Sequence, residues 1–192
     1  TDLYEEFGDE RGPPGQRTTD DFPSLSKSGV PHVDLDDWTF DVTGAVENPI
    51  TFSWEEFRSL PHETQRQDFH CVTGWSKLDC LFTGVPFPVV ADRAGVADEA
   101  VHGLFDALDN YTTDLPLSTV LRDDVLFAWE YDGDPLEPEH GGPLRVVTPH
   151  KYAYKGAKLV SGVEFLTESR RGYWEQRGYS ASADPWSEDR YS

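Results

Sequence analysis

Lysine is scarce in this chain, with five residues among 192, and Lys and Arg together number 16 against 36 Asp and Glu. The formal net charge of -20 argues against nucleic acid and anionic membranes as partners, because both bind clustered Lys and Arg. Apolar runs are short, and residues 85–90 form one of the longest. We therefore expect no transmembrane helix, and residues 1–30 lack the apolar core of a secretory signal.

Cysteine is equally sparse. Two cysteines exclude a disulfide-stabilised scaffold and a four-cysteine zinc site. His62, His102 and His150 lack the spacing of a metal site. The sequence contains neither a CxxCH haem motif nor the glycine pattern of a nucleotide-binding loop. If the protein exchanges electrons, a separate partner must supply or accept them.

Aromatic residues, in contrast, are plentiful. Six Trp, eight Tyr and eleven Phe supply a hydrophobic core, which disordered acidic chains lack. The length suits a single domain over residues 1–192. A folded, acidic and lysine-poor chain is typical of a protein from a halophile, although an ordinary acidic protein is the alternative. We expect a salt-rich cytoplasm, with export after removal of a leader as the alternative.

The spacing of apolar residues predicts an α+β fold dominated by short strands. Residues 1–29, rich in Asp, Gly, Pro and Ser, are expected to form an extended arm. A capping box that begins at Ser53 predicts a short helix over residues 53–60. Further short helical segments are predicted at residues 84–94, 118–122 and 172–178. Strands are predicted at residues 38–46, 65–72, 101–108, 125–131, 144–148 and 159–166.

Acidic residues are absent from residues 140–163, although the chain averages about one acid in five residues. The same stretch contains Arg145 and three of the five lysines, which are Lys151, Lys155 and Lys158. Arg145 can donate two parallel hydrogen bonds to a phosphate or carboxylate, and Lys158 can add a point charge. Backbone N–H groups of residues 141–142 and 155–157 could point at the same anion. The stretch therefore predicts an anion site, and a basic strip paired with surface acids is the alternative.

Cys71 follows a predicted strand and precedes a Thr-Gly turn, so its sulfur can face a cavity. A thiolate in that position can be a nucleophile or a soft metal ligand. A buried structural thiol is the alternative, as is a disulfide with Cys80.

Four segments follow one another along the chain. They are DFHCVTGWS at residues 68–76, followed by Gly84-Val85-Pro86, then YTTDLPL at 111–117, EHGGPLRVV at 139–147 and YKGAKLV at 154–160, which GYWE at 172–175 and DPW at 184–186 continue. Together they resemble the sulfite oxidase family of molybdopterin-dependent oxidoreductases. The resemblance is greatest to small stand-alone members such as methionine sulfoxide reductase catalytic subunits, and it extends from about residue 22 to the C-terminus.

This resemblance implies the family's β-rich molybdopterin-binding fold, Mo-molybdopterin as cofactor, and two-electron oxygen-atom transfer at a cysteine-ligated molybdenum. Cys71 matches the catalytic molybdenum ligand. The positions that match cofactor contacts are Thr113, His140, Arg145, Gly156, Ala157 and Lys158. Molybdopterin is a phosphorylated anion, which agrees with the acid-free stretch. A small-molecule substrate and a separate electron-transfer partner are also implied.

The segment FPSLSKSGVP, residues 22–31, departs from the family's pattern. Leu25, Ser26 and Lys27 stand where sulfite oxidases carry residues that hold the substrate, so sulfite is not expected as the substrate. The sequence also lacks the family's C-terminal dimerisation domain, which predicts a monomer. Two other hypotheses are a non-catalytic domain of the same fold that binds an anion or cofactor, and a thiol redox protein that uses Cys71 and Cys80.

Overall fold

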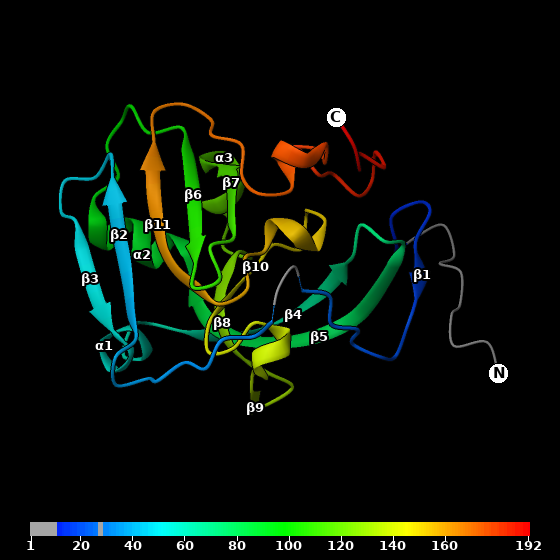
Figure 1. Ribbon diagram of the computed structural model, residues 1–192, viewed down its shortest axis with the longest axis horizontal. Coiled ribbons are helices and arrows are strands. Elements are labelled where there is room, and N and C mark those ends of the chain that lie inside the picture. Colours follow the sequence, from blue (N-terminus) through cyan, green and yellow to red (C-terminus); the bar gives the residue numbers. More distant parts are fainter. Residues whose placement is uncertain (1–10, 27–28) are drawn as a thin grey trace.

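A computed structural model describes residues 11–26 and 29–192, which form two β-sheets with short helices around them (Figure 1). The α+β, β-rich fold class predicted from the sequence is confirmed. One sheet has the order β1-β5-β8-β10, with β4 paired to β5 and β9 paired to β8. Its strands are β1 (Arg17–Thr18), β4 (Glu63–His70), β5 (Trp75–Pro86), β8 (Leu126–Tyr131), β9 (Asp134–Pro135) and β10 (Arg145–Val147).

The second sheet has the order β3-β2-β11-β6-β7. Its strands are β2 (Thr39–Gly44), β3 (Ile50–Ser53), β6 (His102–Ala107), β7 (Thr112–Pro116) and β11 (Val160–Leu166). The helices are α1 (Trp54–Arg58), α2 (Phe87–Ala94), α3 (Leu117–Val120) and the 3-10 turns η1 (Pro138–His140), η2 (Ala153–Lys155) and η3 (Glu175–Arg177). In the described part of the chain, none of these helices has the length and apolar character needed to cross a membrane.

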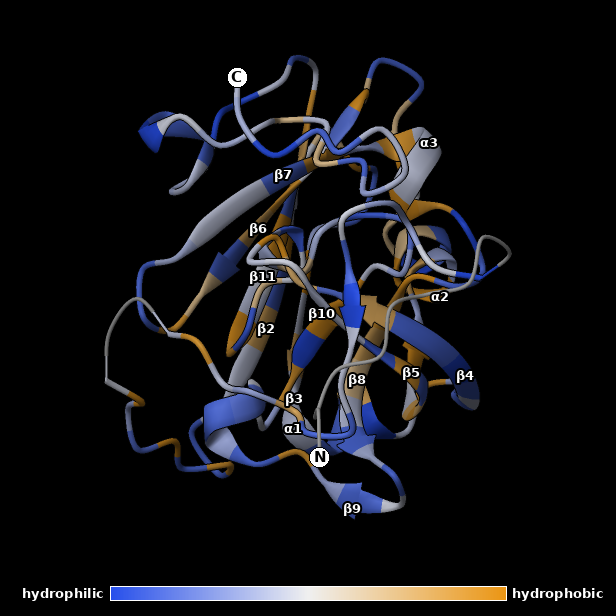
Figure 2. Ribbon diagram, turned by 90° about the vertical axis from the view of Figure 1, so that its right-hand side faces the viewer, coloured by the Kyte–Doolittle hydropathy of each residue, from blue (hydrophilic) through white to orange (hydrophobic). Residues whose placement is uncertain are grey.

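Phenylalanine side chains from both sheets form the core between them. Phe40 of β2 meets Phe127 of β8 edge to face, with ring centroids 5.0 Å apart. Phe87 of α2 stacks on the same Phe127 ring at 5.5 Å. Figure 2 shows hydrophobic residues along the strands of both sheets. Burial of these rings holds the two sheets together, since each aromatic side chain removes a large apolar surface from water.

Helix α1 forms where the capping box predicts it. The Glu56 N–H donates to Ser53 Oγ at 3.3 Å, and the Ser53 N–H donates to Glu56 Oε2 at 2.8 Å. These two bonds satisfy N–H groups that a helix start leaves without partners. The helix is predictable because both residues of the box lie within four positions of each other.

Strands β3 and β7 were not predicted from the sequence, and two further regions differ from the expectation. Residues 84–86 were expected to open a helix, but they end the long strand β5, and α2 begins at Phe87. Gly84 lies so close to β8 that an added Cβ would stand 2.0 Å from the Phe127 carbonyl oxygen. The glycine therefore permits strand pairing at a bulge between Thr83 and Gly84. In the expected N-terminal arm, Arg17–Thr18 forms β1 and pairs in parallel with β5, while residues 1–10 and 27–28 lie outside the described residues.

Candidate cofactor site

A cavity of about 360 Å³ collects most of the site residues predicted from the sequence. It lies against the loop between β4 and β5 on one side and the segments around η1 and η2 on the other. Five of the seven predicted metal and cofactor contacts line it, and these are Cys71, His140, Arg145, Gly156 and Lys158. The predicted metal ligand and the predicted anion site therefore share one cavity.

The loop between β4 and β5 holds Cys71 at the cavity wall. The Cys71 N–H donates to the Trp75 carbonyl at 2.8 Å, and the Gly74 N–H donates to the Cys71 carbonyl at 3.1 Å. Gly74 has a φ of 101°, which favours glycine. The Cys71 sulfur lies 3.1 Å from Thr73 Oγ1 and has no disulfide partner. This tight turn fixes a single thiol toward the cavity, as a metal ligand requires.

Cys80 is in a different environment. Its side chain is buried in the second hydrophobic cluster with Phe69 and Phe82, and it is not among the described residues that line the cavity. Burial raises the pKa of the Cys80 thiol to about 12. The two cysteines are both free thiols, so the structure gives no support to the disulfide or to the thiol redox hypothesis.

Cys80→Ala is therefore expected to leave turnover unchanged. The free energy of unfolding should fall by about 1 kcal/mol, because a small buried group is removed. Steady-state kinetics and denaturant unfolding measure the two effects. Loss of turnover in this variant would revive the thiol redox mechanism.

Arg145 on β10 is a buried cation, and none of the described carboxylates pairs with it. Its side chain is 2% exposed, and a bond of ordinary length runs from Nη1 to the His140 carbonyl at 2.7 Å. The remaining contacts, to the carbonyls of Val146 and Gly156, are long at 3.5 Å. No ion pair to Arg145 is present within residues 11–26 and 29–192. Burial lowers its pKa to about 10.

Lys158 is a second cation without a carboxylate partner in the described part of the chain, and its side chain is half-buried. Its ammonium donates to the Glu139 carbonyl at 2.7 Å and to the Leu25 carbonyl at 3.0 Å, and both acceptors are uncharged. Burial, and then the nearby charge of Arg145, lower the pKa of Lys158 to about 8. Two neighbouring like charges, one buried and one half-buried, are unfavourable in the protein alone when no carboxylate of the described residues pairs with them. An anionic group in the cavity would neutralise both, so the residues fit a phosphorylated cofactor.

Backbone amides add to this fit on one side of the cavity only. The amides of Ala157 and Lys158 have no hydrogen-bond acceptor among the residues that the structure describes. An N–H group without an acceptor in the protein can donate to an anion's oxygens, and Gly156 and Lys158, on either side of Ala157, line the cavity. The expectation was wrong for Gly141 and Gly142, whose N–H groups donate to the carbonyls of Pro138 and Glu137. It was also wrong for Lys155 and Gly156, whose N–H groups donate to the carbonyls of Tyr152 and Ala153.

His140 lies at the end of η1, where its ring stacks on Phe22 with centroids 4.4 Å apart. Burial, followed by the charges of Lys158 and Arg145, lowers the pKa of His140. When the imidazole is neutral, Arg145 and Lys158 carry the positive charge of the cavity wall. The ring therefore faces the cavity as a neutral hydrogen-bonding group.

The side chains of three predicted residues do not line the cavity. The Thr113 side chain is fully buried, and its hydroxyl donates to Glu175 Oε1 at 2.6 Å. Ala157 packs its side chain in the main core cluster, which leaves only its backbone for a ligand. Lys155, expected to contribute to an anion site, forms ion pairs with Glu175 and Asp114 instead. The cavity is therefore lined by fewer cations than the sequence predicts.

An aromatic wall is the feature that sequence reasoning missed. Trp75 and Trp174 line the cavity, and each also packs against one of the two hydrophobic clusters. Tyr111 lines the cavity as well, and its hydroxyl donates to the Tyr154 carbonyl. The sequence contains no signal for this wall, because aromatic residues at a cavity and in a core have the same local pattern.

The described residues contain no cluster of three or more His, Cys, Asp or Glu that could hold a metal by themselves. A metal bound through Cys71 therefore needs further ligands that the cofactor supplies. One cysteine sulfur, two cations without counterions and two unbonded amides around one cavity are the features of a protein that binds a phosphorylated, metal-bearing cofactor.

Comparison with known families agrees with this geometry. The chain belongs to the family described as the oxidoreductase molybdopterin binding domain, which matches residues 27–174. It is a molybdopterin-dependent oxidoreductase, and Mo-molybdopterin is the cofactor that the cavity residues fit. Cys71, Arg145 and Lys158 all lie within the matched residues.

Relatives of two lengths are found. An uncharacterized oxidoreductase of Bacillus subtilis, YuiH, is 41% identical over 183 residues, which cover 95% of this chain and 92% of that protein. The protein-methionine-sulfoxide reductase catalytic subunit MsrP of Campylobacter jejuni is 27% identical over 77% of this chain and 57% of its own length. In fold, the chain is similar to the sulfane dehydrogenase SoxCD of Paracoccus pantotrophus, with a TM-score of 0.69, 19% identity, and coverage of 91% of this chain and 52% of that one.

Proposed function

We propose that this molybdopterin-dependent oxidoreductase catalyses two-electron oxygen-atom transfer to or from a small molecule, with Cys71 as the protein ligand of molybdenum. The observation that carries the proposal is that Cys71, Arg145 and Lys158 line the same cavity. The similarity to MsrP supports this reaction class. A sulfoxide is the substrate class we propose, because the chain departs from sulfite oxidases at Leu25 and Ser26.

The roles of the residues follow from their positions. Arg145 and Lys158 neutralise the cofactor's phosphate, and the amides of Ala157 and Lys158 donate to its oxygens. The turn at Gly74 orients the Cys71 sulfur, and the aromatic wall excludes water from the reacting groups. When bound, the cofactor supplies two-electron redox chemistry and oxygen exchange at its metal.

A separate redox protein or small carrier supplies or accepts the electrons in this proposal, since the sequence contains no haem motif. The monomeric state and the salt-rich cytoplasmic location stay predictions from the sequence. The non-catalytic alternative has the same cavity and differs from the proposal in containing no metal.

Elemental analysis of protein purified from its native host tests the proposal. We expect about one molybdenum, or one tungsten, per chain, since the cofactor fills a single site. The analysis should be combined with release of the pterin by denaturation and measurement of its fluorescence. Native protein that is free of both metals but binds a phosphorylated ligand would favour the non-catalytic alternative.

A further inference from the structure

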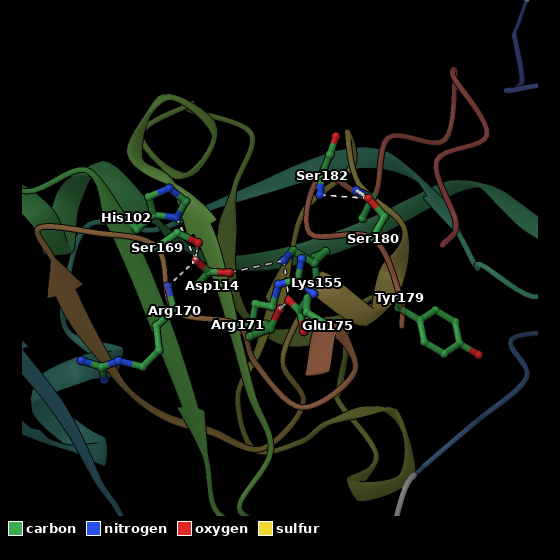
Figure 3. A network of polar contacts seen from close by, with 12 residues as sticks. His102, Asp114, Lys155, Ser169, Arg170, Arg171, Glu175, Tyr179, Ser180 and Ser182 are labelled. Atoms are coloured by element: carbon green, nitrogen blue, oxygen red, sulfur yellow. Dashed lines mark hydrogen bonds and ion pairs between the residues drawn. The ribbon is translucent and has the colours of Figure 1, made fainter. Parts of the chain in front are cut away.

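Lys155 is a fully buried lysine that contacts two carboxylates from different parts of the chain (Figure 3). Its Nζ lies 2.5 Å from Glu175 Oε1, at the start of η3. It lies 3.7 Å from Asp114 Oδ1, on β7. Both carboxylates are also buried.

Further bonds extend this cluster. The Thr113 hydroxyl donates to Glu175 Oε1, so β7 contacts the C-terminal segment directly as well as through Lys155. Asp114 Oδ2 lies 2.9 Å from His102 Nδ1 and accepts a 2.8 Å bond from the Ser169 hydroxyl. Three segments thus meet at one ammonium group: strand β7, the segment around η2, and the segment around η3.

The residues next to this junction are cavity residues. Tyr154 and Gly156, on either side of Lys155, both line the cavity, as does Trp174 beside Glu175. The two unbonded amides follow directly after Gly156. The Tyr154 hydroxyl also donates to the Ser180 carbonyl at 2.5 Å, which provides a second connection between the same two segments. Any shift of Lys155 would therefore move the groups that face the cofactor's phosphate.

Stability alone does not account for buried charges here. Apolar side chains of similar volume often stabilise a core as well as a buried ion pair does, whereas an ion pair fixes which groups meet and in what orientation.

We propose that Lys155 and Glu175 are positioning residues for the cofactor. They hold the segment over residues 156–158 so that the amides of Ala157 and Lys158 and the Lys158 ammonium face the phosphate. Lys155 itself does not contact the cofactor. This inference rests on the proposed function, because it requires a phosphorylated cofactor in the cavity.

The test is Glu175→Gln, which keeps the size of the side chain and an acceptor for Thr113 but removes the charge opposite Lys155. We expect release of the cofactor to accelerate by about 10- to 100-fold, the usual effect of losing a group that orients a ligand. Release is measured as loss of molybdenum and pterin over time. The release rate of each protein is measured at a temperature that lies the same number of degrees below its own Tm. A difference in thermal stability alone then does not change the release rate.

Glu164→Gln is the matched control, because Glu164 pairs with Arg170 at 2.8 Å on the surface, far less buried than Glu175. It should release the cofactor at the wild-type rate. If Glu175→Gln does not fold, Thr113→Val removes one bond to the same carboxylate and should accelerate release to a smaller extent. If the folded Glu175→Gln protein releases the cofactor at the wild-type rate, the inference is overturned. If Glu175→Gln does not fold, the same result in Thr113→Val overturns it. Wild-type protein without molybdenum or tungsten would instead refute the proposed function.

Discussion

The Cys71→Ser protein is expected to fold normally and to lose all detectable turnover. The new hydroxyl can keep the contact with Thr73, and the turn around Gly74 depends on backbone bonds that the substitution leaves intact. A serine oxygen is a much harder donor than a thiolate, so even when bound it would not reproduce the electronic effect of sulfur on the metal. Steady-state assays with an artificial electron donor and a sulfoxide measure the loss.

The cofactor's phosphate contacts remain in this variant, so we expect pterin to be retained in part while the sulfur-to-metal absorption bands disappear. The matched control is Cys80→Ser, in which the other thiol changes by the same atom and the bands persist. Substantial activity in the Cys71→Ser protein would eliminate this residue as the ligand, whatever metal the protein contains.

Arg145→Ala should weaken cofactor binding by about 10- to 100-fold. A hydrogen bond to a charged group contributes about 1.5–3 kcal/mol, and each 1.4 kcal/mol corresponds to a factor of ten. The phosphate would then share its charge with Lys158 alone. The measurement is the molybdenum and pterin content after extensive dialysis, together with the affinity of the cofactor-free protein for added cofactor.

Arg145→Lys separates charge from geometry at this position. It keeps a cation but loses the planar fork, and we expect affinity between that of the wild type and that of the alanine variant. Arg122→Ala serves as the control, because Arg122 is half-exposed and pairs with Asp124 at the surface. Full occupancy in Arg145→Ala after dialysis would show that this arginine serves the fold and not the cofactor.

Local signals in the sequence predicted the elements they encode. The capping box predicts α1, and the alternation of residues in Thr39–Gly44 places Phe40 and Val42 in the core as expected. The composition of residues 140–163 predicts an anion site, and Arg145 and Lys158 of this stretch both line the cavity. In each case neighbouring residues, or one short segment, contain the whole signal.

Predictions failed where a distant partner decides the outcome. Lys155 and Lys158 are three positions apart, yet the first is neutralised by acids from β7 and η3 and the second is not. The residues next to Lys155 in the sequence give no indication that Asp114 and Glu175 will pair with it. The extension of β5 through Gly84 likewise depends on the carbonyl of Phe127 in another strand.

The position of Glu175 has a consequence for any attempt to exchange parts between relatives. A chimera that transplanted only the residues matching the family, 27–174, would carry the Lys155 ammonium into its new host without the Glu175 carboxylate. The interior of the chimera would then contain a positive charge whose main counterion is missing. The unit that can be recombined is therefore longer than the family match and includes at least Glu175.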